Sequence, residues 1–237
     1  MRTTETYFIY FYEGEQKKRF VLSKGKYDTT VQELKSLLSS EEKEILQKFK
    51  VASRQNEFIA GRILAKNSIS AIDQQLSANK INIIHGVWGY PLVTSNDIQN
   101  MWISIAHSKE YAAAIASEVS THPIGIDVEE ISAENESSLA HFLSSYEMDL
   151  SLEEKHIYWA SKEAAAKALR TGFTIPEHLF EISEVDYSDG LYTIKFKHLV
   201  RLQAIAWIQN EVVTCIAYPT ELQFKSIQKH NFSITKT

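Results

Sequence analysis

The chain has 237 residues, which is enough for one large domain or for two small ones that each bury a core. With 44% hydrophobic and 23% charged residues, and only 8 glycines and 4 prolines, its composition excludes disorder as the main state. The net charge of −5 argues against binding nucleic acid through overall charge, although it leaves a local basic patch open.

Cysteine content and hydropathy narrow the class of protein further. The single cysteine, Cys215, excludes an internal disulfide and a zinc site of several thiolates. It lies in the apolar run 212–217, where a packed core thiol is expected. No run of 18 or more apolar residues is present, and the first residues lack the apolar region of a signal peptide. We therefore expect a cytoplasmic protein with no membrane contact.

Strands and helices are both predicted in the first half of the chain. Residues 6–12 are aromatic and β-branched and predict a strand, which residues 19–22 can pair with. A capping box at Ser39 and Glu42 predicts a helix as far as residue 49. Apolar residues at helical spacing predict a long helix over residues 54–76. Further expected elements are strands at 81–85, 102–106 and 112–117, and a turn at 88–91.

The second half repeats this pattern loosely. A strand is predicted at 124–128 and a helix at 137–146, and a second capping box at Ser151 and Glu154 opens a helix to Leu169, followed by Gly172 as its C-cap. Residues 179–217 read as strands, with a hairpin turn at 188–190, whereas no element is expected after Pro219. The order of elements predicts an α+β fold with two similar halves.

Two carboxylates stand on one predicted strand. In the run I-G-I-D-V-E at 124–129, Asp127 and Glu129 point to the same face because strand side chains alternate. The two carboxylates of such a pair repel each other unless a cation lies between them. Mg²⁺ is a suitable cation because it prefers carboxylate oxygens as ligands. An exposed acidic strand end is the alternative, which the run taken alone favours because Glu130 follows directly.

A lysine and a glutamate share one face of the second capped helix. In W-A-S-K-E-A-A-A-K at 159–167, Glu163 and Lys167 are four residues apart. A plain surface ion pair, worth roughly 0.3–0.5 kcal/mol, is one interpretation. The small, apolar surroundings instead favour a buried pair that needs a partner, such as a metal with phosphates. His107, after an apolar strand, is a candidate phosphate donor, although alone it fits a hydrogen-bonded histidine better.

Together these motifs resemble the paired signature of 4′-phosphopantetheinyl transferases, G-[IV]-D-x-E followed by W-[SCTA]-x-K-E-[AS]-x-x-K. Glu163 follows Asp127 by 36 positions, within the family's usual gap. Upstream, W-G-Y-P-L and I-S-I-A-H-S resemble the family's G-K-P and N-[IV]-S-H-S motifs, and the helix from Arg54 resembles its basic helix. Tyr90 stands where the family has lysine, and Ser104 where it has asparagine. The resemblance spans about residues 54–169, half the chain.

The resemblance implies a holo-[acyl-carrier-protein] synthase of the long, two-lobed, surfactin-synthetase-activating type. Such an enzyme moves the phosphopantetheine arm of coenzyme A to a serine of an apo acyl or peptidyl carrier protein and releases 3′,5′-ADP. The implied fold is a monomer whose two α+β lobes, residues 1–119 and 120–237, form a pseudo-dimer with coenzyme A between them. Carrier proteins are acidic, so a locally basic docking surface is expected despite the net negative charge.

The resemblance also implies roles for particular residues. Mg²⁺, with Mn²⁺ left open, is expected on Asp127, Glu129 and Glu163, and Glu163 and Lys167 are the implied catalytic residues. The implied coenzyme A contacts are basic side chains: Arg54, Arg62, His107, Lys162 and Lys167. Two alternatives stay open, namely a Mg²⁺-dependent nucleotide phosphohydrolase and a non-catalytic binder of coenzyme A or a carrier protein. The intact acidic residues argue against the second.

Overall fold

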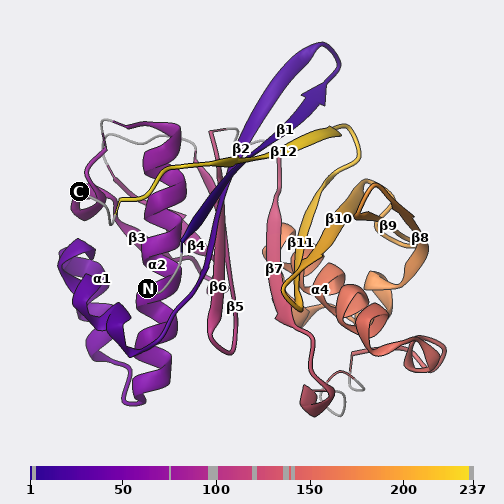
Figure 1. The fold of residues 1–237 in the computed structure, drawn as a ribbon, viewed down its shortest axis with the longest axis horizontal. Helices are drawn as coiled ribbons and strands as arrows, with labels where there is room; N and C mark the ends of the chain where they lie inside the picture. The colour runs from indigo at the N-terminus through magenta and orange to yellow at the C-terminus, as the bar shows by residue number, and fades with distance from the viewer. Residues whose placement is uncertain are drawn as a thin grey trace. The chain divides into compact units, whose positions relative to one another are not determined.

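The computed structural model describes residues 1, 4–74, 76–95, 101–118, 122–135, 139 and 142–234. The chain divides into two compact units, Met1–His122 with Leu222–Thr237, and Pro123–Glu221. Each unit contains a five-stranded antiparallel sheet with a long helix packed on it (Figure 1). The predicted α+β class is therefore confirmed.

The sheet of the first unit has the order β12-β1-β2-β6-β5. Its hairpin of β1 and β2 pairs Ile9 with Phe20, and both side chains are fully buried. The helix α2 (Ala52–Ile72) packs on this sheet, contacting β2, β5 and β6. The strands are β1 (Glu5–Glu13), β2 (Gln16–Lys26), β5 (Trp102–Ser108), β6 (Tyr111–Ser117) and β12 (Gln223–His230).

A buried polar network joins the smaller elements of this unit to α2. Ser39 and Glu42 form the predicted capping box, each side chain accepting a hydrogen bond from the other's backbone N–H. The same Glu42 carboxylate pairs with the Lys66 ammonium at 2.6 Å, and neither side chain is exposed. The smaller elements are α1 (Ser40–Gln47), β3 (Ile83–His85), β4 (Pro91–Val93) and the 3₁₀ helices Thr29–Leu37 and Ala78–Lys80.

The sheet of the second unit has the order β7-β11-β10-β9-β8 and is covered by α4 (Leu152–Ala168). The predicted capping box at Ser151 is present. Buried alanines, which have small side chains, line the face of α4 that packs on the sheet. Asp189 and Gly190 both have positive φ, as a tight hairpin turn requires. The strands are β7 (Gly125–Glu130), β8 (Ile182–Ser188), β9 (Leu191–Phe196), β10 (Leu202–Gln209) and β11 (Val212–Pro219), and the 3₁₀ helices are Ala133–Asn135, Glu147–Asp149, Gly172–Thr174 and Glu177–Phe180.

Two local expectations are wrong. The segment after Pro219 was expected to carry no element, yet it forms β12, an edge strand that pairs with β1. Its mostly polar, exposed residues give a weak strand pattern, and its partner lies at the other end of the sequence. Gly172 was expected to cap the C-terminus of α4. However, this helix ends at Ala168, and the first residue after it with a left-handed backbone is Arg170, with φ of 57°, two positions before Gly172.

Other expectations fall partly outside the described residues. The predicted lobe boundary, between residues 119 and 120, lies outside the described residues. The contacts within the chain divide it between His122 and Pro123 and place residues 222–237 in the first unit. The helix expected at 137–146 also lies partly outside the described residues: within its described part, Leu139 is helical, whereas residues 142–146 are not.

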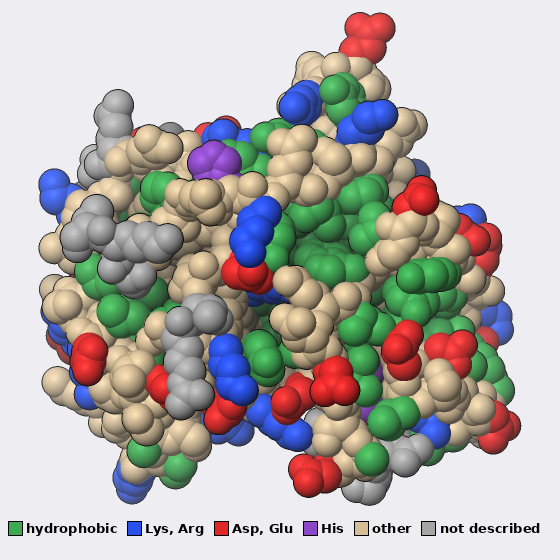
Figure 2. Space-filling view, in the orientation of Figure 1, with side chains coloured by type: hydrophobic (Ala, Val, Ile, Leu, Met, Phe, Trp, Pro, Cys, Tyr) green, Lys and Arg blue, Asp and Glu red, His purple; other side chains and the backbone are tan. Residues whose placement is uncertain are grey.

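Two properties of the side chains complete the description. Cys215 is fully buried, which confirms the expected core thiol, and burial raises its pKa to about 12. Within the described part of the chain, no helix is both long and apolar enough to cross a membrane. On the face drawn in Figure 2, acidic and basic side chains are spread among hydrophobic ones.

Candidate active site

A glycine brings the acidic strand β7 directly onto α4. A Cβ atom on Gly125 would lie 1.8 Å from the carbonyl oxygen of Ala164 and 2.6 Å from the nitrogen of Ala168. Both distances are far inside van der Waals contact, so only glycine allows the strand to lie this close to the helix backbone. The glycine of the G-I-D-V-E run therefore positions the carboxylate that follows it two residues later.

Asp127, Glu163 and Lys167 meet where β7 passes α4. The Lys167 ammonium lies 2.5 Å from Oδ1 of Asp127 and 3.7 Å from Oε2 of Glu163. Asp127 is 2% exposed, and within the described residues its second oxygen, Oδ2, has no hydrogen-bond partner. A buried carboxylate oxygen without a partner is rare in native proteins and calls for a ligand or a structural reason.

The charges of this cluster act on one another. Burial raises the pKa of Asp127 well above its usual value, Lys167 opposes the rise, and Glu129 and Glu163 add to it. Burial lowers the pKa of Lys167, but Asp127 and Glu163 outweigh this effect, so that the net shift is upward. One ammonium thus faces three carboxylates, and the cluster favours an additional cation.

The donor atoms of this cluster suit a hard divalent cation, since all are carboxylate oxygens and one of them is buried without a partner. As they stand, however, no three His, Cys, Asp or Glu side chains of the described residues are gathered closely enough to hold a metal ion. The Lys167 ammonium lies against Asp127 instead. A metal ion that bound Asp127 would compete with this ammonium.

Trp159 holds Glu129 in place, a role that was not predicted. Its indole Nε1–H donates a hydrogen bond of 3.1 Å to Oε1 of Glu129. The indole ring also packs against Phe142, with 4.3 Å between ring centroids. The sequence analysis used Trp159 as part of the apolar surroundings and of the family signature, but gave it no role at the carboxylates. Its place one helical turn before Glu163 was the available signal, because residues four apart share a helix face.

Lys162 lies apart from the carboxylate cluster. Its ammonium donates to Oε2 of Glu147 at 2.5 Å and to the carbonyl oxygen of Phe142 at 3.1 Å, and the Glu147 side chain is fully buried. Successive residues on a helix point about 100° apart, so Lys162 does not share the face of Glu163. The structure therefore does not bring Lys162 together with Asp127.

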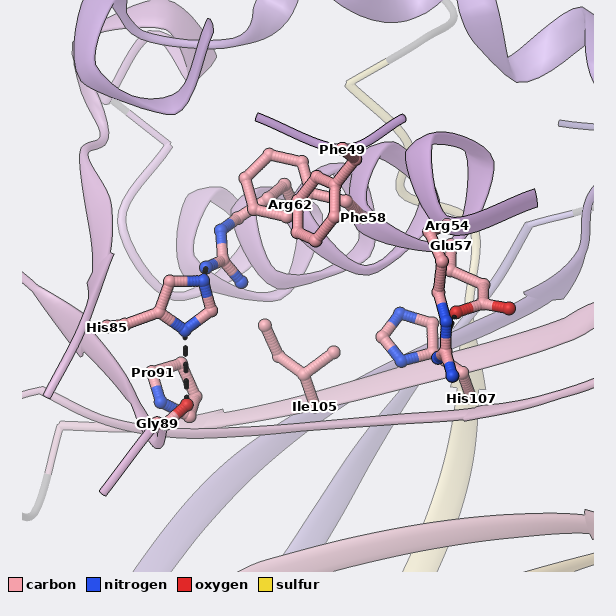
Figure 3. A pocket seen from close by; sticks show the side chains of 10 residues that line it. All are labelled: Phe49, Arg54, Glu57, Phe58, Arg62, His85, Gly89, Pro91, Ile105 and His107. Carbon is pink, nitrogen blue, oxygen red and sulfur yellow. Dashed lines mark hydrogen bonds and ion pairs between the residues drawn. The ribbon is translucent and has the colours of Figure 1, made fainter. Parts of the chain in front are cut away.

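The first unit contains a basic cavity of about 250 Å³ beside α2. Figure 3 shows the residues that line it, with Ile105 between the two histidines. The cavity brings together three residues that the sequence predicted for coenzyme A, and adds others that it did not. The main lining residues are Arg54, Arg62, His85, His107, Phe49 and Phe58.

Arg62 is buried at this cavity with incomplete hydrogen bonding. Its guanidinium stacks over the Phe58 ring at 4.6 Å and lies 3.9 Å from the Glu42 carboxylate, and burial lowers its pKa to about 10. Arg62 donates a hydrogen bond of 3.3 Å to Nε2 of His85, whose Nδ1–H donates to the Gly89 carbonyl. Nε of Arg62, the atom that lies 3.9 Å from Glu42, has no hydrogen-bond partner among the described residues.

A second glycine brings His107 against α2. A Cβ atom on Gly61 would lie 2.4 Å from Nε2 of His107, so the imidazole rests on the helix where a side chain is missing. Arg54, about two helical turns before Gly61 on α2, has a 69% exposed side chain and pairs with Glu57 at 2.8 Å. Two arginines and two histidines outnumber the single acidic residue of the lining, so this cavity suits an anionic group beside aromatic rings.

Comparison with known proteins identifies the class. Residues 41–117 match the family model described as the 4′-phosphopantetheinyl transferase N-terminal domain, and residues 123–217 match that of the 4′-phosphopantetheinyl transferase superfamily. The two matches fall on the two sheet-and-helix units, one on each. The chain belongs to the 4′-phosphopantetheinyl transferase superfamily.

Individual relatives agree with this class. A holo-[acyl-carrier-protein] synthase of Petrotoga mobilis is 30% identical over 35% of this chain and 79% of that protein. One of Mycoplasma mycoides is 41% identical over 28% of this chain, and the chain spans only 61% of that relative's length. A crystal structure of a Bacillus anthracis holo-(acyl-carrier-protein) synthase with CoA (3′,5′-ADP) is 22% identical over 46% of this chain and 95% of that chain, with a TM-score of 0.38, too low to support an argument.

Proposed function

We propose that this protein transfers the 4′-phosphopantetheine group of coenzyme A to a serine of an apo carrier protein. The observation that carries the proposal is the cluster at β7 and α4, in which Asp127, Glu163 and Lys167 meet beside a buried carboxylate oxygen without a partner. Membership of the superfamily and similarity to holo-[acyl-carrier-protein] synthases support the same activity.

In the proposed reaction, the serine Oγ attacks the β-phosphorus of the coenzyme A pyrophosphate. A new bond forms between this oxygen and phosphorus, the bond from phosphorus to the bridging oxygen breaks, and 3′,5′-ADP leaves. The serine proton passes to the Glu163 carboxylate, which is half-buried on α4 and open to a substrate. Lys167, held by Asp127, provides a positive charge for the departing phosphate.

We assign Asp127, Glu129 and Glu163 as the residues that would hold Mg²⁺, with Mn²⁺ left open. When bound, the ion would neutralise pyrophosphate charge. Trp159 supports this assignment, because its hydrogen bond fixes the orientation of Glu129. Lys162 is not included in the phosphate contacts of this proposal, since its ammonium is already engaged with Glu147.

We assign the basic cavity of the first unit to the adenosine-phosphate end of coenzyme A. Arg62 and His107 offer N–H donors to phosphate, and the rings of Phe49 and Phe58 offer a flat apolar surface. The Nε–H of Arg62, buried without a hydrogen bond among the described residues, would gain one. The lobe arrangement with coenzyme A between the units, the monomeric state, the acidic carrier and the cytoplasmic location all stay predictions.

The experiment is incubation of the protein with coenzyme A, Mg²⁺ and an apo carrier protein, followed by intact-mass spectrometry of the carrier and chromatography of nucleotides. We expect the carrier to gain one phosphopantetheine arm and 3′,5′-ADP to appear in equal amount. A carrier with its acceptor serine replaced by alanine is the matched control and should gain nothing.

The outcomes separate the remaining alternatives. Release of 3′,5′-ADP without any carrier would identify a Mg²⁺-dependent phosphohydrolase and reject the transferase. Binding of coenzyme A with neither product, across several apo carriers and with Mg²⁺ or Mn²⁺, would identify a non-catalytic binder. Omitting the divalent ion tests the metal assignment separately, since transfer at full rate without it would reject that assignment alone.

A further inference from the structure

The second unit contains a cavity of about 340 Å³ that the proposed transfer reaction does not use. Its volume falls in the range of small-molecule sites, about 300–1,000 Å³. Aliphatic side chains of α4 and β8 form part of it, and it shares no lining residue with the cluster around Asp127. Its other main lining residues are four tyrosines and two glutamates, Tyr146, Tyr158, Tyr187, Tyr192, Glu154 and Glu184.

The tyrosines come from different elements and are tied by their hydroxyls or by stacking. Tyr187 and Tyr192 face each other across the β8–β9 hairpin, with 4.5 Å between ring centroids. The Tyr192 hydroxyl donates to Glu153 at 2.8 Å, and the Tyr146 hydroxyl donates to the carbonyl oxygen of Ile182 at 3.1 Å. These contacts hold the rings in place, and yet Tyr146 is 48% and Tyr187 61% exposed.

The charge around this cavity is negative. Glu153, Glu154 and Glu184 lie at or beside it, and Lys195 pairs with Glu184 at 2.9 Å and balances one of them. Burial and the hydrogen bond to Glu153 together raise the pKa of Tyr192 to about 12, so the phenol stays protonated at neutral pH. In the view of Figure 2, acidic and hydrophobic side chains adjoin where Figure 1 draws α4 and β8.

We propose that this cavity binds an organic ammonium group, with the tyrosine rings against its apolar surface and the glutamates at its edge. Aromatic faces attract cations through their quadrupole, and carboxylates add a longer-range attraction. A neutral ligand would make no use of the carboxylates, and an anion would be repelled by them. A hydrated metal ion would make no use of the rings and the aliphatic side chains.

The probe is choline chloride, compared with 3,3-dimethylbutan-1-ol, which has nearly the same shape but no charge. Binding is measured by calorimetry and by saturation transfer to the methyl protons, without coenzyme A or carrier protein. We expect choline to bind about tenfold more tightly than the alcohol. Tyr187→Leu should weaken choline binding about fivefold, because this exposed ring contributes a cation–π contact and no core packing.

Two further variants make the test specific. Glu154→Gln keeps the helix cap, since glutamine can accept the same hydrogen bond, but removes the charge, and should weaken choline about threefold without affecting the alcohol. Tyr12→Leu on β1 is the control and should leave both affinities unchanged. Equal affinity of the unsubstituted protein for the two probes would overturn the proposal. Absence of choline binding to this protein would also overturn it, provided that its melting temperature shows it to be folded.

Discussion

The two units use the same architecture with opposite charge. In the first, α2 on its sheet borders a cavity lined by Arg54, Arg62 and His107. In the second, α4 on its sheet meets Asp127 beside Glu163. A helix packed on an antiparallel sheet therefore does not determine the chemistry of a site. A few side chains along the helix and the facing strand determine whether the site is positively or negatively charged.

Among the described residues, the site of each unit also contains a buried polar atom of its own sign that has no hydrogen-bond partner. In the first this atom is the Nε–H of Arg62, and in the second it is Oδ2 of Asp127. Such an atom costs about 1–3 kcal/mol when buried. A ligand that supplies the missing partner recovers this energy, so the two atoms point to an anion in one unit and a cation in the other. A third such atom, Oε1 of Glu147, belongs to the internal pair with Lys162.

The largest effect is expected from Asp127→Ala, which removes the buried carboxylate of the second unit. Transfer should fall more than about 10³-fold, because Lys167 loses its partner and the acidic cluster loses its central ligand. The measurement is single-turnover transfer at saturating Mg²⁺. The affinity of the first unit for 3′,5′-ADP should change less than twofold, if the two sites are chemically independent. Near wild-type turnover would remove Asp127 from the mechanism.

Glu163→Gln tests the second unit more finely, because it keeps the size and one oxygen but removes the charge and the basicity. If Glu163 takes the serine proton, single-turnover transfer should slow by about 10²–10⁴-fold at every Mg²⁺ concentration. Recovery of the full rate at high Mg²⁺ would leave Glu163 as a metal ligand only. Unchanged activity without extra metal would reduce it to an ion pair with Lys167.

The two close-approach glycines should respond differently to alanine. Gly125→Ala places a methyl group against the backbone of Ala164, which cannot move, and should lower the free energy of unfolding by about 3 kcal/mol or more. Gly61→Ala places it against the side chains of His107 and Ile105, which can shift more readily than a helix backbone, and should change stability by less than about 1 kcal/mol. It should instead weaken 3′,5′-ADP binding. Chemical denaturation and calorimetry measure both, and equal destabilisation would contradict the comparison.

An effect on stability alone concerns two lysines whose pKa values shift in opposite directions. The pKa of Lys167 is raised, whereas burial lowers that of Lys24 in the first unit from 10.5 to about 8. Between pH 8 and 10.5 the unfolded chain therefore holds the Lys24 proton more tightly, so this group makes stability rise with pH. The gain is on the order of 2–3 kcal/mol.

Lys24→Met tests this directly, because it keeps a long apolar side chain and removes the titrating group. The variant should be more stable than the wild type near pH 7, and the difference should shrink as pH approaches 10.5. Urea denaturation at several pH values measures the difference, in which the titration of other groups cancels. A difference that does not vary with pH would show that Lys24 titrates normally.

Local rules predicted much of this structure. Both capping boxes, at Ser39 and Ser151, depend on residues three positions apart and are present. Strand alternation places Asp127 and Glu129 on the face that meets α4, where Lys167 and Trp159 contact them. These features could be predicted because the interacting residues are set by the geometry of a single helix or strand.

Features that depend on distant residues were missed. Glu42 and His85 position Arg62, but neither is its sequence neighbour, and a buried ion pair of Glu42 with Lys66 has no local pattern. The close approach of Gly125 to α4 is likewise a property of the packed fold. The role of Lys162 as a coenzyme A contact, which the family resemblance implied, stays a prediction, and its pairing with the distant, buried Glu147 has no local pattern.

The pairing of β12 with β1 bears on how the chain folds during synthesis. Glu5 and Lys229 form an ion pair across these strands although 224 residues separate them. At about 5–20 residues per second, a ribosome adds that length in roughly 10–45 s. For that period β1 is an open sheet edge rich in aromatic residues, the kind of edge that pairs with other chains. The N-terminal unit therefore cannot be completed first, and the nascent chain must shield this edge while the whole second unit is being made.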